Sequence, residues 1–284
     1  MNPPSPGYGA AGPPSQSSGV AGDDVDLAVV GGASSGKPGA QSASQELRPP
    51  SHKNGNDLRV RWLGRMEFGE ALALQEEIVA MKRENPSAQD ELLLLEHEPV
   101  YTIGRTPDKS SLLGAAHLPH PLFPINRGGQ ATYHGPGQLM GYPIVDLRRC
   151  GQDLHKYLRW LEQLLIDLLA EYNISATRCE GLTGVWVESP EINRAGRKIA
   201  SIGVGVRHWI TMHGFALNVC GDLMPFAKIV PCGISNVTMT SMERETGQAI
   251  SVAAVAAVCE KYALRKISDL RVERALSAGS AACL

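Results

Sequence analysis

Residues 153–172 read DLHKYLRWLEQLLIDLLAEY, the strongest regular pattern in the chain. Apolar side chains recur there every three or four residues, as on one face of a helix: Leu154, Leu158, Leu161, Leu165, Leu168 and Tyr172. Asp153 stands directly before the first of them, where its carboxylate can accept backbone N–H groups and cap the helix. The pattern predicts a helix over 153–172 that buries one face in a core.

The segments after this helix are short and apolar, which is typical of strands, at 184–188, 198–210 and 215–219. Upstream, residues 91–96 contain four consecutive leucines and predict a buried strand. We expect residues 101–103 to continue the same sheet after a turn.

Two further helices are expected, at 68–83 and 252–264. The first would bury Ala71, Leu74, Ile78 and Met81 on one face. The helices and strands do not form repeated strand–helix–strand units. The predicted fold class is therefore α+β, with one core around a mainly antiparallel or mixed sheet.

Composition excludes several classes of protein. The 284 residues are 43% hydrophobic, which is enough to build a core, and the net charge is −2. A nucleic-acid partner normally requires a basic face, so we expect none. We expect no membrane partner either, because no apolar run approaches the roughly 18 residues of a spanning helix.

Six cysteines are present, and no two are spaced as C-x-x-C. A zinc or thioredoxin-like site is therefore not expected, and we predict no metal. A long chain without a recognisable signal peptide is not typical of a disulfide framework. We expect mostly free thiols and a cytoplasmic location.

Residues 1–57 are rich in Pro, Gly, Ser and Ala and contain one aromatic residue. Such a segment cannot bury enough apolar surface to fold, so we predict a disordered extension followed by one domain over 58–284. The segment has acidic residues and no arginine before Arg48, unlike an organelle transit peptide, and it lacks the apolar core of a secretory signal.

A glycine-rich stretch, RGGQATYHGPGQ at 127–138, is the densest polar motif. Its glycines let the backbone turn and approach a ligand, while Arg127 and His134 supply a cation and a titratable ring. A hairpin loop with incidental polar groups is the alternative interpretation.

Three further motifs follow in order: RKIASIG at 197–203, HGFALN at 213–218 and PCGI at 231–234. Lys198 is ambiguous because most strand lysines are solvated, and His213 is equally consistent with a core or turn histidine. Cys232 stands in a turn between Pro and Gly, where a thiol can reach substrate, although most cysteines are inert.

Together the four motifs resemble those of the octanoyltransferases of lipoate biosynthesis, from about residue 58 to 270. The resemblance implies the α/β fold of biotin and lipoate protein ligases, a central mixed sheet flanked by helices. It implies transfer of an octanoyl or lipoyl group from acyl carrier protein to a lysine of lipoyl domains. The acceptors would be the 2-oxoacid dehydrogenases and the glycine cleavage H protein, and no cofactor is implied.

By this resemblance Cys232 is the nucleophile, and Lys198 lowers the pKa of its thiol. The residues assigned to the acyl pocket are Arg127, Gly128, Gly129, Gln130, Ala131, Thr132, Tyr133, His134, Ser201, Ile202, Gly203, His213, Gly214 and Phe215. A thiol suits the chemistry because its acyl form is another thioester, close in energy to the donor. One nearby cation contributes several kcal/mol, enough to make the thiolate the major form.

Three alternatives remain at this point. A lipoate-protein ligase would activate free lipoate with ATP and need no catalytic cysteine. A Cys–His hydrolase would pair Cys232 with His134 or His213. A non-catalytic module would reuse the fold, and would be expected to lack Cys232 or Lys198.

Overall fold

The computed structural model describes residues 58–106, 110–112, 118–188, 196–231 and 237–280, with backbone alone over 272–280. The predicted extension 1–57 and Cys232 lie outside the described residues.

The helices are α1 (Phe68–Glu84), α2 (Leu154–Ala170), α3 (Met242–Thr246) and α4 (Val252–Ser280), with 3-10 turns at Leu147–Arg149 and Met224–Lys228. The strands are β1 (Leu58–Met66), β2 (Asp90–His97), β3 (Val100–Ile103), β4 (Leu122–Pro124), β5 (Thr132–His134), β6 (Gln138–Ile144), β7 (Ala176–Cys179), β8 (Leu182–Val187), β9 (Arg197–Arg207) and β10 (Ile210–Asn218).

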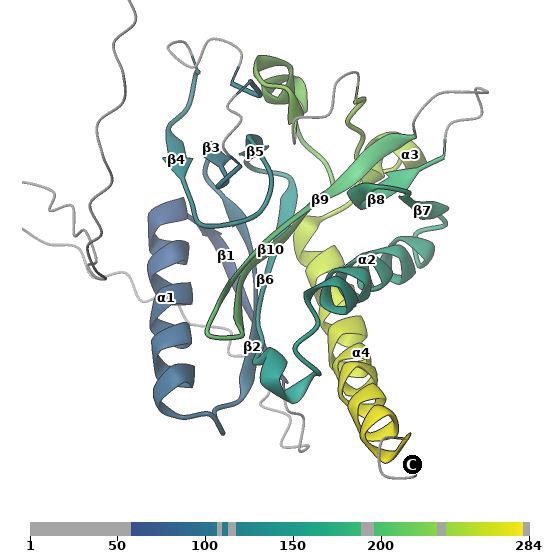
Figure 1. Cartoon of the computed structure of the whole chain (residues 1–284). Coiled ribbons are helices and arrows are strands. Elements are labelled where there is room, and N and C mark those ends of the chain that lie inside the picture. The colour runs from purple at the N-terminus through teal and green to yellow at the C-terminus, as the bar shows by residue number, and fades with distance from the viewer. Residues whose placement is uncertain (1–57, 107–109, 113–117, 189–195, 232–236, 281–284) are drawn as a thin grey trace, which may run out of the picture. The chain divides into compact units, whose positions relative to one another are not determined.

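Seven strands form the main sheet in the order β1-β2-β6-β10-β9-β8-β7 (Figure 1). The β1–β2 pair is parallel, and the other neighbours run antiparallel. The sheet is thus mixed and mainly antiparallel, as predicted.

Helices cover both faces of this sheet. One apolar cluster joins α1 to β2, β6 and β10, and a larger one joins α2 and α4 to the opposite face (Figure 1). The predicted helix at 153–172 is confirmed, and the Asp153 side chain accepts the Lys156 N–H at its start. Helix α4 continues beyond the predicted end at residue 264. Within the described part of the chain, no helix is both long and apolar enough to cross a membrane.

Helix α1 confirms the prediction for 68–83 but buries a different face. Met81 is 44% exposed, so its predicted place in the core is wrong. Lys82 occupies the buried stripe instead, because its ammonium bonds Asp90 at 2.6 Å. Gln75, another polar residue, is also fully buried.

Two strand predictions need correction. Residues 101–103 do not continue the main sheet: β3 pairs with β4 and β5 in a separate three-stranded sheet. The run 198–210 is not one strand, because His208 and Trp209 form the turn between β9 and β10 with φ of 51° and 64°. Two positive φ values are typical of a tight hairpin, but that turn normally carries Asn-Gly, so nothing in His-Trp signals it.

Candidate active site

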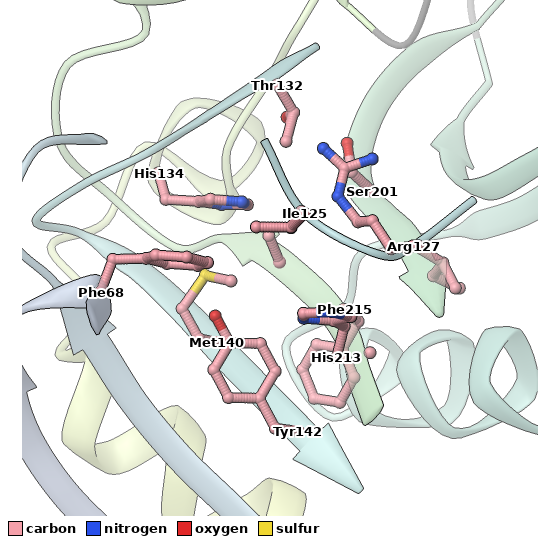
Figure 2. Close-up of a pocket in the computed structure, with 14 residues that line it drawn as sticks. Phe68, Ile125, Arg127, Thr132, His134, Met140, Tyr142, Ser201, His213 and Phe215 are labelled. Atoms are coloured by element: carbon pink, nitrogen blue, oxygen red, sulfur yellow. The ribbon is translucent and has the colours of Figure 1, made fainter. Parts of the chain in front are cut away.

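A narrow cavity, called the slot below, lies between α1, the loop before β5, and strands β5, β6, β9 and β10 (Figure 2). Its lining consists of Phe68, Ile125, Arg127, Thr132, His134, Met140, Tyr142, Ser201, Ile202, Gly203, His213, Gly214, Phe215 and Ala216. The volume is about 40 Å³, room for about two or three waters. The slot brings together nine of the fourteen residues that the motifs assign to the acyl pocket.

Five lining residues are not among those that the resemblance assigns to the acyl pocket, although Ala216 lies within the HGFALN motif: Phe68, Ile125, Met140, Tyr142 and Ala216. Strand alternation could have indicated two of them. The glycine-rich motif runs directly into β6, where alternate residues share a face, so Met140 and Tyr142 follow Gln138 on one side.

The other five motif residues lie elsewhere. Gly128 and Gly129 line a second cavity, while Ala131 and Tyr133 belong to an apolar cluster with Tyr101 and Phe226. Strand alternation explains this, because Tyr133 points away from the side that Thr132 and His134 share. Gln130 is half-buried and lines neither cavity. The binding roles of these residues stay predictions.

Arg127 is a buried cation at the edge of the slot. Its guanidinium donates to the Thr102 carbonyl and hydroxyl at 3.1 and 2.9 Å and to the Gly128 carbonyl at 2.9 Å. Gly203 leaves the space for it, since a Cβ there would lie 2.9 Å from the Arg127 Cδ. The positive charge is thereby fixed in place before any ligand arrives.

His134 is held as a neutral ring. Gln138 donates through its Nε2 to the Tyr133 carbonyl, so its Oε1 accepts from the His134 Nδ1–H at 3.3 Å. The Thr102 hydroxyl, already accepting from Arg127, donates to His134 Nε2 at 3.2 Å. Burial, with the nearby His97 and Arg127, holds the pKa of His134 well below its usual range. Both ring nitrogens are engaged, which argues against His134 as a catalytic base.

Tyr142 is fixed by a histidine that the motifs do not include. His97 Nδ1 donates to the Met66 carbonyl at 3.1 Å, so its Nε2 accepts the Tyr142 hydroxyl proton at 2.7 Å. Burial lowers the pKa of His97 to about 4 and raises that of Tyr142. The pair is a neutral, oriented part of the slot wall.

Thr132 presents a polar group to the slot. It is 5% exposed, and its hydroxyl has no hydrogen-bond partner among the residues that the structure describes. A buried hydroxyl without a partner is unfavourable by about 1–3 kcal/mol, which a ligand carbonyl could offset. In Figure 2, Thr132 and Ser201 lie at the opposite end of the slot from His213 and Tyr142.

His213 has an unusual backbone for a strand residue, with φ of 58°. Only a few per cent of non-glycine residues adopt positive φ, and in a strand it requires support from neighbours. Burial, and secondarily the Arg127 charge, lower the pKa of His213 to about 4. The imidazole is therefore neutral near pH 7.

Lys198 is not a surface lysine: it is 1% exposed. Its Nζ lies 5.2 Å from the centre of the Trp186 ring, and Gly184 leaves room for it, because a Cβ there would lie 2.8 Å from the Lys198 Cε. Lys198 lines the second cavity, of about 350 Å³, which shares Arg127, Ile202 and Gly203 with the slot.

The segments that precede and follow Cys232 in the sequence are held by backbone hydrogen bonds, one of them to the strand of Lys198. The Lys198 backbone pairs with Thr238 and Thr240 at 2.8 and 3.0 Å, a few residues after Cys232. Val230, just before it, donates to the Ser111 carbonyl at 2.9 Å. Cys232 itself lies outside the described residues, so its pairing with Lys198 stays a prediction.

Residues 67–263 match the sequence family described as the lipoyl protein ligase A/B catalytic domain. An octanoyltransferase of Geobacter sulfurreducens is 53% identical over 207 residues, covering 72% of this chain and 83% of that protein. An octanoyltransferase of Synechococcus elongatus is 48% identical over 188 residues, covering 65% and 78%.

Solved structures show the same fold. A bipartite lipoate protein ligase of Thermoplasma acidophilum superposes with a TM-score of 0.59 at 15% identity, covering 74% of this chain and 83% of that one. A lipoate-protein ligase A bound with ATP gives 0.54. The predicted ligase-type fold is therefore confirmed, and the chain belongs to the octanoyltransferases within the lipoyl protein ligase A/B catalytic-domain family.

Proposed function

We propose that this protein transfers an octanoyl group from acyl carrier protein to a lysine of lipoyl domains, through a thioester on Cys232. The observation that carries the proposal is the fully buried Lys198 beside a narrow slot, bonded to the segment that follows Cys232. The relatives named octanoyltransferase, at about half identity, support the acyl group and the reaction type.

The chemistry follows from a cation near a thiol. A buried ammonium favours the thiolate, because charge–charge attraction is strong where water is excluded. The thiolate attacks the donor thioester, the C–S bond to the donor breaks as a new C–S bond to Cys232 forms, and the departing sulfur takes a proton from the Lys198 ammonium, which becomes a neutral amine. The acceptor amine then attacks the acyl-enzyme, the C–S bond to Cys232 breaks, and the amine proton passes to a base, for which we propose Lys198.

The slot suits the acyl chain in polarity and direction. The unpartnered Thr132 hydroxyl and Ser201 mark its polar end, which we assign to the carbonyl, and Phe215 and Tyr142 lie toward the tail. An eight-carbon chain exceeds the present volume of about 40 Å³, so lining side chains move apart on binding. Met140 is suited to this, because its thioether side chain repacks at little energetic cost.

A Cys–His hydrolase fits less well. His134 is neutral with both ring nitrogens hydrogen-bonded, so it cannot take a proton from a thiol without breaking that network. The low pKa of His213, about 4, makes it a weak base. Both histidines are therefore poor candidates for the base, and we assign that role to Lys198.

For partners and location, we propose lipoyl domains of 2-oxoacid dehydrogenases and the glycine cleavage H protein as acceptors. We propose the cytoplasm as the location. A reducing compartment is supported by the cysteines in the described part of the chain, because Cys150, Cys179, Cys220 and Cys259 form no disulfide there.

Intact-mass measurement tests the function directly. Incubation with octanoyl-carrier protein, without ATP, should add one octanoyl group that hydroxylamine removes. Cys232→Ser should abolish the adduct, and the matched Cys179→Ser should not. Acylation that requires free octanoate and ATP would overturn the proposal in favour of a ligase.

A further inference from the structure

The wall of the slot contains a gap in the hydrogen-bond ladder between β6 and β10. The two strands pair regularly from Phe215↔Gly141 to Asn218↔Gln138. Toward the other end of β10, the Thr211 N–H donates to the Val145 carbonyl. Both registers place Pro143 opposite His213. Proline has no N–H to donate to the His213 carbonyl, so the regular pairing is interrupted at this point in a central strand.

Helix α1 supplies a hydrogen bond at this gap. The backbone N–H of His213 donates to the Gln75 Oε1 at 2.8 Å, and the Gln75 Nε2 donates to the Ala71 carbonyl at 3.2 Å. Gln75 is fully buried, and no motif of the sequence includes it. Its carboxamide is thus oriented by its own helix and holds the strand in the conformation with φ of 58°.

This conformation sets the direction of the imidazole. In regular strand geometry, successive side chains alternate between the two faces, and a left-handed residue breaks that alternation. In Figure 2 the His213 ring stands beside Phe215, at the end of the slot away from Thr132. On the other side it packs near Gly205, where a Cβ would lie 3.4 Å from the His213 Cδ2.

We infer that Gln75 is a positioning residue that, by holding His213 in its left-handed conformation, fixes the end of the slot away from Thr132 and so the acyl length it accepts. This inference rests on the proposed function, because it takes the slot as the acyl site. Gln75 itself touches no reacting atom.

The test compares hexanoyl, octanoyl and decanoyl thioesters of N-acetylcysteamine in three full-length variants. Gln75→Met keeps the size but removes the acceptor, Gln75→Glu keeps an acceptor oxygen, and Glu76→Met makes a similar change at an exposed neighbour. In Gln75→Met we expect the decanoyl-to-octanoyl ratio of kcat/KM to rise by at least about tenfold, mainly through KM, because the two chains differ by two methylenes and one alone can provide that discrimination. Gln75→Glu should restore most of the native ratio, and Glu76→Met should leave it unchanged. An unaltered ratio in Gln75→Met would overturn the inference, even if its melting temperature fell.

A thermal double-mutant cycle tests the backbone part without any activity. Glycine adopts positive φ readily, so Gln75→Met should lower the melting temperature less in a His213→Gly background than in the native one. Equal losses in both backgrounds would show that Gln75 does not hold this conformation. Absence of acyl transfer by the native protein would instead refute the proposed function, and the cycle would still report on Gln75.

Discussion

Two lysines in this protein are equally buried, at 1% exposure each, in different regions with different surroundings. Lys82, on α1, donates to the carbonyls of Ala88 and Gln89 at 3.1 and 3.2 Å and to Asp90 at 2.6 Å. Its three N–H groups therefore match three acceptors.

Asp90 in turn gathers other parts of the fold. Arg149 and Arg271 reach its carboxylate at 2.6 and 2.7 Å, so one buried anion ties together α1, β2, the 3-10 turn and α4. In contrast, Lys198 lies over an aromatic ring, opposite a glycine, with its side chain lining a cavity. The three acceptors around the Lys82 ammonium indicate a structural lysine. The cavity beside Lys198 leaves room for a substrate.

The same substitution at both positions should give opposite results. For Lys198→Met we expect octanoyl transfer to fall by about 100-fold or more, the usual contribution of a proton-transfer group. The melting temperature should stay equal or rise, because a buried ammonium is expensive to desolvate. Steady-state transfer assays and thermal melts check this, and near-native activity would make Lys198 a packing residue. Lys198→Arg, which keeps the charge but does not release its proton, should acylate faster than it deacylates.

At Lys82 the loss should be in stability. Lys82→Met removes one of three cations from Asp90, so we expect a loss of about 3 kcal/mol, the low end for breaking a buried pair. This corresponds to a drop of roughly 6–12 °C in melting temperature. Activity measured well below the melting transition should be native. A loss of activity without a loss of stability would remove the distinction between the two lysines.

Acidic pH should lower the stability of the fold around the slot, because His97 and His213 are buried there as neutral rings. Burial lowers the pKa of His97 and His213 to about 4, below the ordinary value of 6.5, so the unfolded chain binds more protons between these values. Stability is therefore full above pH 6.5 and falls as pH decreases toward 4, by up to about 3 kcal/mol per histidine. Urea midpoints at pH 7 and 4.5 measure the change. His97→Leu should reduce it, while the exposed control His155→Leu should not.

Removal of residues 1–57 should have the smallest effect. The segment is rich in Pro, Gly, Ser and Ala and lacks core-forming side chains, so it should add little to the stability of the folded domain. Melting temperature and transfer rate should both stay within error of the full chain. A clear decrease in either would contradict the predicted single domain at 58–284.

Much of the fold could be predicted because its signals are local. The spacing of leucines and the cap at Asp153 define α2, and the leucine run defines β2. The partner of a strand is not a local property, so nothing in residues 101–103 indicates that β3 pairs in a separate sheet. The buried stripe of α1 is not evident from its sequence for a similar reason: Lys82 is buried only because Asp90 lies opposite.

The residues of the site also divide into those with a local sequence signal and those without one. Short motifs identify most of the slot, since glycines, Arg127 and His134 occur close together. Gln75 and His97 could not be found, because each acts through hydrogen bonds to residues distant in sequence. The burial of Lys198 likewise depends on the missing side chain at Gly184, on another strand.

The interruption of the β6–β10 ladder at His213 also has a consequence for hydrogen exchange. The amide proton of His213 is held by a helix side chain, whereas its neighbours along β10 bond to other strands. Its exchange rate should therefore follow the undocking of α1 from the sheet, while neighbouring amides follow opening of the sheet itself. Deuterium uptake at the His213 amide would thus measure how often α1 separates from the sheet. The same measurement with a bound acyl chain would show how much the chain reduces that opening.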